Sequence, residues 1–201
     1  MMTEGYIKFT VHLNETEVQV PEALQELNTV RTALFDKGMI GILPDGVGFG
    51  NLSIKEAGSD LFFISGTATG GKRILDLQDY CRVDSCSIER NEVHCSGHIC
   101  ASAETLSHYA VYHANPEIHC VIHIHHKAFF QRLLTSDCPA TSPDAAYGTP
   151  EMAHDIEALV KRTPAAHGIL VMTGHEDGVI AWGRTITETY NVLMSHFKLL
   201  G

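Results

Sequence analysis

The chain has 201 residues, a length that suits one domain with a full hydrophobic core. Its 14 Lys and Arg against 24 Asp and Glu give a net charge of −10, which argues against nucleic acid or an anionic membrane as a partner. This net charge does not exclude a local pocket that binds a small anion. No apolar stretch approaches the roughly 20 residues of a membrane span, and the N-terminus lacks the basic and apolar regions of a signal peptide. The sequence therefore predicts a cytoplasmic protein whose six cysteines are thiols.

The N-terminal part predicts a strand and a packing helix, with no chemistry assigned to either. Residues 6–14 alternate between apolar and polar and are expected to form a strand that suits a sheet edge. Pro21 suits the first turn of a helix, apolar residues recur at helical spacing as far as Phe35, and Gly38 is a natural stop.

Two glycine-rich segments adjoin the next predicted strands. Residues 41–50 lead into a short strand, although a plain loop is the simpler interpretation of this segment alone. Residues 61–64 form a buried strand that runs into the Gly-, Ser- and Thr-rich loop 65–72. Such a loop exposes the N–H and hydroxyl groups that a phosphate site needs. Arg73 follows Lys72, which breaks the Walker A pattern, so nucleotide binding is not expected.

Residues 81–95 alternate as two strands with a turn near 89–92. The cysteines in this region are spaced too widely for the usual two-residue zinc knuckle. A second metal site made from Cys95, His98 and Cys100 is an alternative that the spacing disfavours.

The following helix carries a carboxylate near its start. Ser102 is a reasonable N-cap, Glu104 would lie in the first turn, and His108 would lie one turn later on the same face. The helix is expected to end near Asn115, because Pro116 disfavours helical structure in the residue before it.

The pattern Val-Ile-His-Ile-His at 121–125 is typical of a strand with two histidines on one face. His123 and His125 would then be about 7 Å apart at the backbone, close enough to bind one divalent ion. With 13 histidines in the chain, such a pair can arise by chance. Burying these side chains unpaired would cost about 1–3 kcal/mol each, which favours a metal site. A third histidine and a carboxylate from other segments would complete it.

The C-terminal third alternates helices and strands around one further candidate ligand, His175. This residue is expected in a turn between two strands, from which it can reach a neighbouring strand. Together these elements predict one compact α/β domain over residues 1–201. The expected segments are a helix at 126–134, a loop at 135–146, a helix at 150–161, strands at 168–172 and 179–182, and a last helix from Thr185 or Thr187 almost to Gly201.

An ordered set of motifs over residues 25–200 resembles the class II aldolase/adducin family. The resemblance implies a three-layer α/β/α sandwich around a mixed, largely antiparallel sheet, and a homotetramer with active sites at subunit boundaries. The motifs are Gly50-Asn51-Leu52-Ser53, Thr67-Ala68-Thr69-Gly70, Ser102-Ala103-Glu104 with His108, His123-Ile124-His125, Tyr147-Gly148-Thr149-Pro150-Glu151 and His175-Glu176-Asp177-Gly178.

The resemblance also implies the parts of the site. A divalent metal, most commonly Zn²⁺, would be held by His123, His125 and His175. Glu104 would be a fourth ligand in the resting state and the acid/base in turnover. The substrate phosphate would contact the positions Gly50, Asn51, Thr69, Gly70 and Ser102.

The implied reaction is retro-aldol cleavage of a C–C bond in a short sugar phosphate or related hydroxy-ketone, with the enediolate stabilised by the metal. The alternatives are a pentulose-phosphate 4-epimerase or a dehydratase on the same scaffold, a non-enzymatic adducin-like interaction module, and a purely structural metal. Three departures from the family bear on the substrate: Ala103 replaces a second serine, His-Glu-Asp-Gly at 175–178 replaces the commoner His-Gly, and no tail follows the last helix to supply a tyrosine.

Overall fold

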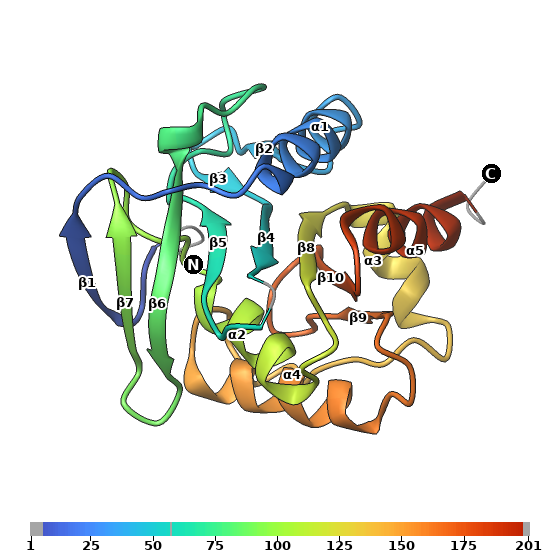
Figure 1. Ribbon diagram of the computed structural model, residues 1–201. Helices are drawn as coiled ribbons and strands as arrows, with labels where there is room; N and C mark the ends of the chain where they lie inside the picture. Colours follow the sequence, from blue (N-terminus) through green and yellow to red (C-terminus); the bar gives the residue numbers. More distant parts are fainter. Residues whose placement is uncertain (1–5, 57, 199–201) are drawn as a thin grey trace.

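The computed structural model describes residues 6–56 and 58–198, and Figure 1 shows their arrangement. One large sheet contains the strands β1 (Thr10–Glu15), β4 (Asn51–Lys55), β5 (Phe62–Ser65), β6 (Tyr80–Ser87), β7 (Glu92–Gly97), β8 (Cys120–His125), β9 (Gly168–Val171) and β10 (Gly178–Gly183). A separate hairpin contains β2 (Gly41–Ile42) and β3 (Gly48–Phe49).

The order of the eight strands is β1-β7-β6-β5-β4-β8-β10-β9. Edge strand β1 runs parallel to β7, and every other pair of neighbours in this sheet is antiparallel. The prediction of a mixed, largely antiparallel sheet is confirmed, as is the edge position of the first strand.

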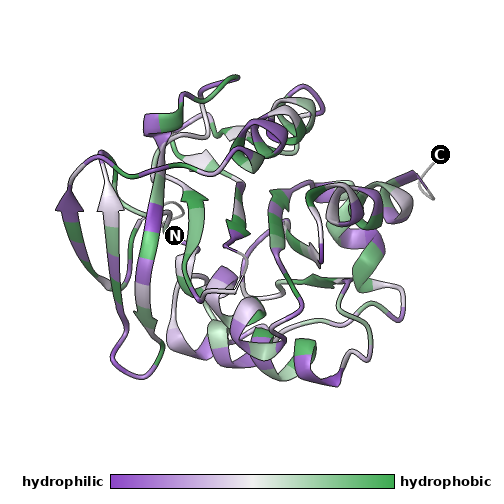
Figure 2. Ribbon diagram, in the orientation of Figure 1, coloured by the Kyte–Doolittle hydropathy of each residue, from purple (hydrophilic) through white to green (hydrophobic). Residues whose placement is uncertain are grey.

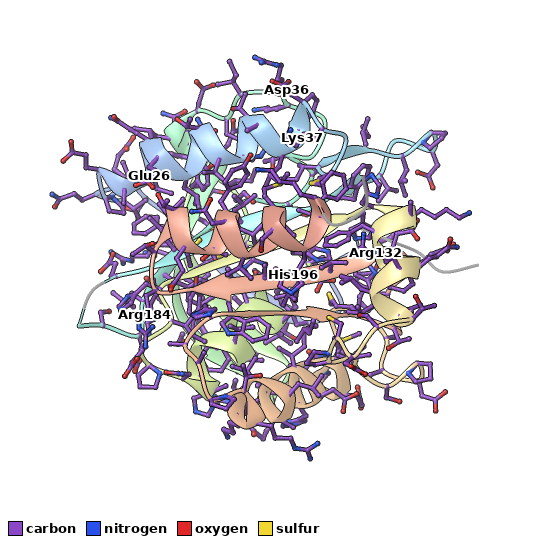
Figure 3. The ribbon with its side chains drawn as sticks, turned by 90° about the vertical axis from the view of Figure 1, so that its right-hand side faces the viewer. Glu26, Asp36, Lys37, Arg132, Arg184 and His196 are labelled. Atoms are coloured by element: carbon purple, nitrogen blue, oxygen red, sulfur yellow. The ribbon has the colours of Figure 1, made fainter. Side chains whose placement is uncertain are left out.

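Helices cover both faces of the sheet, which gives the predicted three-layer sandwich. Figures 1 and 3 show α2 and α4 on one side and α1, α3 and α5 on the other. No helix in the described ranges is long and apolar enough to cross a membrane. The bounds are α1 (Ala23–Phe35), α2 (Thr105–Ala114), α3 (Lys127–Leu134), α4 (Pro150–Arg162) and α5 (Ile186–Lys198), with a short 3₁₀ turn at Leu77–Asp79.

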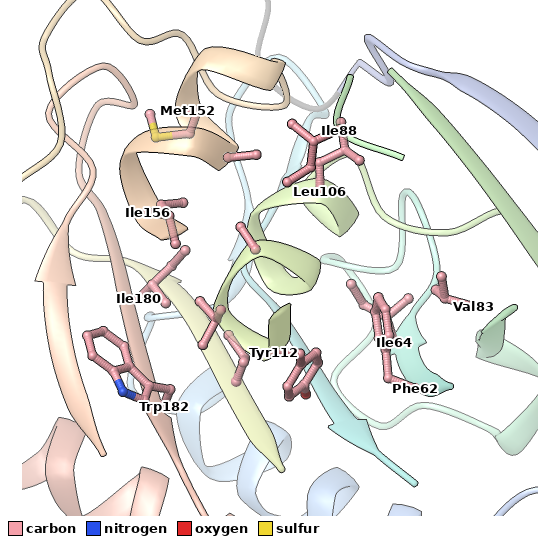
Figure 4. Packing of buried hydrophobic residues seen from close by; sticks show 14 of the residues in the cluster. Phe62, Ile64, Val83, Ile88, Leu106, Tyr112, Met152, Ile156, Ile180 and Trp182 are labelled. Atoms are coloured by element: carbon pink, nitrogen blue, oxygen red, sulfur yellow. The ribbon is translucent and has the colours of Figure 1, made fainter. Parts of the chain in front are cut away.

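A separate hydrophobic core lies on each face of the sheet. Figure 4 shows the first core, where Leu106, Met152 and Ile156 from α2 and α4 pack near Ile180 and Trp182 of β10. The second core joins α1, α3 and α5 to the opposite face. Figure 2 shows the largely hydrophobic colouring of the central strands β4, β5 and β8. These two cores hold the central strands in place from both sides.

Alternation along β8 decides which way its histidines point. Val121 belongs to the core beneath α2 and α4, whereas Ile122 and Ile124 belong to the core beneath α1 and α5. Because side chains alternate along a strand, His123 and His125 lie on the same face as Val121. The predicted arrangement of two histidines on one face is confirmed.

Several predicted boundaries differ from those observed. The first strand begins at Thr10 rather than at residue 6. Pro21 precedes α1, whose N-cap is Glu22, while Gly38 ends the helix in a left-handed conformation with φ 69°, as predicted. His126 caps α3 instead of starting it, and its ring nitrogen accepts a hydrogen bond from the Phe129 N–H.

The prediction for Ser102 was wrong in its structural role. Helix α2 begins at Thr105 with Glu104 at the N-cap position, so Glu104 lies just before the first turn. The Ser102 carbonyl accepts hydrogen bonds from the Thr105 N–H and hydroxyl, at 3.0 and 2.6 Å. The Ser102 hydroxyl is instead 3.0 Å from the Asn51 side-chain nitrogen on β4. A contact with β4, far away in the sequence, therefore takes the place of the local cap.

Candidate metal centre

Three histidine side chains converge at the end of β8. His123 and His125 lie on this strand, and His175 lies in the turn between β9 and β10. The Nε2 atom of His125 is 3.0 Å from Nε2 of His123 and 3.0 Å from Nε2 of His175. Ligand nitrogens about 2.0–2.1 Å from a tetrahedral ion would be roughly 3.3 Å apart. The observed spacing therefore fits one divalent ion after shifts of a few tenths of an ångström, and this group can hold a metal.

The three imidazoles have the protonation state that a metal requires. All three are buried. Burial lowers the pKa of His123 to about 4 and the pKa of His125 and His175 well below the ordinary value. At neutral pH the rings are therefore uncharged, and neutral imidazole is the form that binds a metal.

Backbone contacts orient these rings. The Val179 carbonyl lies 3.2 Å from Nδ1 of His123 and so accepts its proton, which leaves the Nε2 lone pair for a ligand. Gly178 pairs with His125 across β10 and β8. A Cβ at Gly178 would lie 2.9 Å from Cδ2 of His175 and 3.3 Å from Cε1 of His123. The absence of a side chain at this position lets the two rings approach each other.

Glu104 brings a carboxylate to the same point. Its side chain is buried, and Oε1 lies 3.7 Å from Nε2 of His175. Ser107, one helical turn later, donates a hydrogen bond to Oε2 at 2.7 Å. This bond orients the carboxylate, so a proton could be moved at Oε1. The structure thus brings together all four residues that the resemblance implied as ligands.

The predicted phosphate positions line the same hollow. Asn51 and Ser102 share a hydrogen bond, and Oδ1 of Asn51 has no partner among the described residues. The amide and the hydroxyl can each donate and accept hydrogen bonds.

The loop after β5 forms the opposite wall. Thr69 donates to the Gly66 carbonyl at 2.8 Å, and the buried guanidinium of Arg31 donates to the Thr69 carbonyl at 2.9 Å. Gly70 packs against the β2–β3 hairpin so tightly that a Cβ would lie 2.3 Å from the Gly41 carbonyl oxygen. Gly50, with φ 78°, immediately precedes β4 and lines the same hollow. Arg31 and the close packing of Gly70 hold the loop from behind.

These elements line a partly open pocket with a volume of about 40 Å³. That volume can hold a few water molecules or one small anion. All the predicted site residues line it, and so do two aromatic residues that were not predicted as site residues. The lining residues are Gly48, Phe49, Gly50, Asn51, Gly66, Thr67, Ala68, Thr69, Gly70, Ser102, Ala103, Glu104, His123, His125, Tyr147 and His175.

Sequence reasoning missed three neighbours of the centre. Ser107 could have been found from its spacing of three residues from Glu104, which places both on one helical face. Tyr147 was quoted as part of a motif without a role, yet its ring stacks on His175 with centroids 4.7 Å apart. Lys8 reaches Tyr147 from before β1, and no local pattern in the sequence indicates that contact.

His108 does not belong to the group of histidines that could hold a metal ion. Its Nδ1 lies 2.7 Å from the Ser53 hydroxyl, which in turn lies 2.6 Å from the hydroxyl of Tyr112. Burial lowers the pKa of His108 well below its ordinary value, so the ring is neutral. This network joins α2 to β4 behind the metal centre.

A second group of possible ligands lies on the outer strands. Nε2 of His12 and Nε2 of His94 are 2.8 and 3.3 Å from the same oxygen of Glu92. The two rings stack with centroids 4.3 Å apart at an angle of 13°, and the three residues are exposed or only partly buried, unlike the three central histidines. We interpret this group as an ion-pair cluster.

The alternative cysteine site is not formed. Within the described ranges, Cys95, His98 and Cys100 do not make a group that could hold an ion. All six cysteines are free thiols, as predicted.

The chain is similar to known proteins in its sequence family and in its fold. Residues 44–199 match the family described as Class II Aldolase and Adducin N-terminal domain. The sequence matches none of the curated proteins with which it was compared.

Solved structures with a similar fold include sugar-phosphate aldolases. The L-fuculose-1-phosphate aldolase from Thermus thermophilus is 19% identical, with a TM-score of 0.63, over 86% of this chain and 90% of that one. Another L-fuculose 1-phosphate aldolase is 18% identical, with a TM-score of 0.65, over 90% and 84% of the two chains. A sugar-phosphate aldolase from Thermotoga maritima is 13% identical, with a TM-score of 0.64, over 88% and 91%. At identities of 13–19%, the similarity to these structures establishes the fold of this chain and not its activity.

Proposed function

Because the chain belongs to the class II aldolase and adducin family, we propose that it is a metal-dependent lyase that cleaves a C–C bond in a short sugar phosphate or related hydroxy-ketone. The observation that carries this proposal is the convergence of three histidines: Nε2 of His125 lies 3.0 Å from Nε2 of both His123 and His175, and the Glu104 carboxylate lies 3.7 Å from Nε2 of His175. Imidazole and carboxylate donors in this number suit Zn²⁺, which we propose as the native metal.

His123, His125 and His175 would hold the ion, with Glu104 as a fourth ligand at rest. When bound, a divalent cation polarises a carbonyl and stabilises the negative charge that develops as the C–C bond breaks. Glu104 would leave the ion when substrate arrives and would then hold the proton that moves in the reaction, at Oε1. Ser107 keeps this carboxylate in place through Oε2. A ligand that substrate can displace distinguishes this arrangement from a closed structural site.

The anion of the substrate would occupy the other end of the hollow. Gly50, Asn51, Thr69, Gly70 and Ser102 supply backbone N–H groups, hydroxyls and an amide there, and these donors suit a phosphate. Binding the phosphate apart from the reacting bond would orient the substrate. Support for a phosphorylated substrate comes from two structural relatives, an L-fuculose-1-phosphate aldolase and a sugar-phosphate aldolase.

Two alternatives use the same residues. An epimerase or dehydratase would need the same metal and the same carboxylate, so product analysis separates these activities from cleavage. An adducin-like interaction module would have no use for four convergent ligand atoms that are buried, and we rank it below an enzyme. The proposal further includes a homotetramer, taken from the family resemblance, and the cytoplasmic location that was predicted from the sequence.

The first test is metal content measured by mass spectrometry. We compare the wild type with His125→Ala and with His154→Ala, a control at an exposed histidine on α4. We expect about one divalent ion per chain in the wild type and in the control, and its loss in His125→Ala. A panel of ketose phosphates and their unphosphorylated counterparts is then assayed for cleavage products. The absence of metal from the wild type, even after incubation with Zn²⁺, would contradict the proposal.

A further inference from the structure

The segment just before β1 reaches the metal centre from outside. Lys8 extends its side chain over the face of the Tyr147 ring, with Nζ 3.6 Å from the ring centroid. Nζ also donates a hydrogen bond to the Tyr147 carbonyl at 3.0 Å. The Tyr6 N–H donates to the Tyr147 hydroxyl at 3.3 Å. Three contacts from this short segment therefore converge on one tyrosine.

The same segment is itself tied to the sheet. The side-chain nitrogen of Asn91, in the turn between β6 and β7, donates to the Lys8 carbonyl at 2.8 Å. From Thr10 onward, β1 pairs with β7 residue by residue. Lys8 is thus anchored on its main chain while its side chain contacts Tyr147. The contact joins residues 139 positions apart in the sequence.

Tyr147 in turn contacts a metal ligand. Its side chain is buried, and its ring lies at 29° to that of His175 with centroids 4.7 Å apart. His175 lies in a turn, so strand pairing does not fix its side chain as it fixes those of His123 and His125. A ring packed against the imidazole is a direct way to hold its plane. Residues that orient a ligand in this way commonly set metal affinity.

We propose that Lys8 is a positioning residue of the metal centre: by clamping Tyr147, it fixes the plane in which His175 presents Nε2. This inference rests on the proposed metal site and names a residue outside the matched family range of 44–199. Lys8 acts through Tyr147 and is not a metal ligand.

Electrostatics supports the same placement. Lys8 is partly exposed. Burial lowers the pKa of its ammonium group, and the negative charge of Glu104 opposes that shift. The ammonium group therefore interacts with the charge of the Glu104 carboxylate as well as with the tyrosine ring. A cation over an aromatic face is worth about 0.5–1 kcal/mol at an exposed site and more when it loses water.

The experiment compares the metal affinity of four proteins. Lys8→Met keeps the aliphatic stem and removes the charge and the donor, whereas Lys8→Arg keeps both. Lys37→Met is the control, because Lys37 is an exposed lysine at the end of α1 (Figure 3) and its loss changes the net charge equally. We measure the Zn²⁺ dissociation constant by chelator competition, and the visible absorption of the Co²⁺-loaded protein as a report on ligand geometry.

We expect Lys8→Met to weaken Zn²⁺ binding by about 10-fold and to change the Co²⁺ spectrum. Lys8→Arg and Lys37→Met should behave like the wild type. If Lys8→Met does not fold, Lys8→Gln keeps an N–H donor without the charge and provides the same comparison. Wild-type affinity and an unchanged spectrum in a folded, uncharged Lys8 variant would overturn the proposal.

A double-mutant cycle tests the route through the tyrosine. If Lys8 acts through Tyr147, Lys8→Met should have little further effect on Zn²⁺ affinity in a Tyr147→Leu background. Equal effects in both backgrounds would contradict the clamp. The outcome is separable from that of the proposed function: a wild type that binds metal and cleaves nothing contradicts only the lyase, whereas a wild type that binds no metal overturns both.

Discussion

Glu104 is the residue on which the proposed reaction should depend most, because it is a carboxylate buried beside the three proposed metal ligands. Its Oε2 atom accepts the Ser107 hydroxyl at 2.7 Å, and Oε1 faces His175. The amide in Glu104→Gln has nearly the same shape but cannot accept and release a proton. The Glu104→Gln variant therefore tests proton transfer while it leaves the three histidines that would bind the metal unchanged.

We predict that Glu104→Gln lowers kcat by about 10²- to 10⁴-fold, the usual contribution of a positioned acid/base. Metal content should stay at half the wild-type level or more, since three histidines remain. The measurement is the cleavage rate on the best substrate of the panel, with thermal melting to check the fold. Full activity in a folded, metal-loaded variant would remove Glu104 from the mechanism.

The buried histidines make the metal-free protein sensitive to acid. Burial lowers the pKa of His123 to about 4, whereas a histidine in the unfolded chain titrates near 6.5. Above pH 6.5 both states hold the neutral ring. Between these two values only the unfolded state takes up the proton, so stability must fall as the pH falls.

We therefore predict that the free energy of unfolding of the metal-free protein decreases from pH 6.5 to about pH 4. A shift of this size in one histidine corresponds to about 3 kcal/mol. Urea titrations at a series of pH values measure it, and His123→Gln should have a shallower dependence over the same range. The same slope in the variant and the wild type would assign the acid sensitivity to other groups.

At the scale of elements, the loop 65–72 and the β2–β3 hairpin form one wall of the site by close backbone contact. Gly70 lies where a Cβ would be 2.3 Å from the Gly41 carbonyl oxygen and 2.8 Å from the Gly48 Cα atom. The adjacent Gly71 has room, because its Cβ would meet only the Ile42 side chain, at 3.4 Å. The chain thus offers a matched pair of glycines in one loop.

We predict that Gly70→Ala raises KM for a phosphorylated substrate by about 10-fold or more and lowers stability by about 1–3 kcal/mol, because the loop and the hairpin must separate. Gly71→Ala should change both quantities little. Steady-state kinetics and denaturant titration measure the two effects. If both variants gave the wild-type KM, the loop would not contact the anion.

At the scale of the whole molecule, the proposed metal ligands come from parts of the fold that are distant in the sequence. His123 and His125 belong to β8, His175 follows β9, and Glu104 precedes α2. An ion bound to all four in the native state, and not to the unfolded chain, stabilises the whole domain. At a free metal concentration 100 times the dissociation constant, this gain is about 2.7 kcal/mol.

We predict that Zn²⁺ at that concentration raises the melting temperature by about 5–10 °C over the chelator-treated protein, given a shift of about 2–4 °C per kcal/mol for a chain of this size. His125→Ala should lose most of the increase. Differential scanning calorimetry measures both. An equal increase in His125→Ala would mean that the ion stabilises the fold through some other site.

The parts of the protein that depend on local periodicity could be predicted from the sequence. The alternation at 121–125 correctly placed His123 and His125 on one face, because the two-residue period of a strand needs no information from the rest of the chain. The end of the helix at Gly38 was also predicted from a local signal, because glycine readily adopts the left-handed backbone conformation that ends a helix. The family resemblance assigned His175 and Glu104 their roles as ligands, because no local rule connects these residues to β8.

Only the tertiary structure decided the contacts that complete the site. Ser102 was expected to cap its own helix, yet it bonds to Asn51 on β4, because the sheet brings a better partner within reach. Lys8 meets Tyr147 across 139 residues. Such pairs are set by the order of strands in the sheet and by the packing of two cores. That order depends on the free energy of the whole folded chain, and no short stretch of sequence determines it.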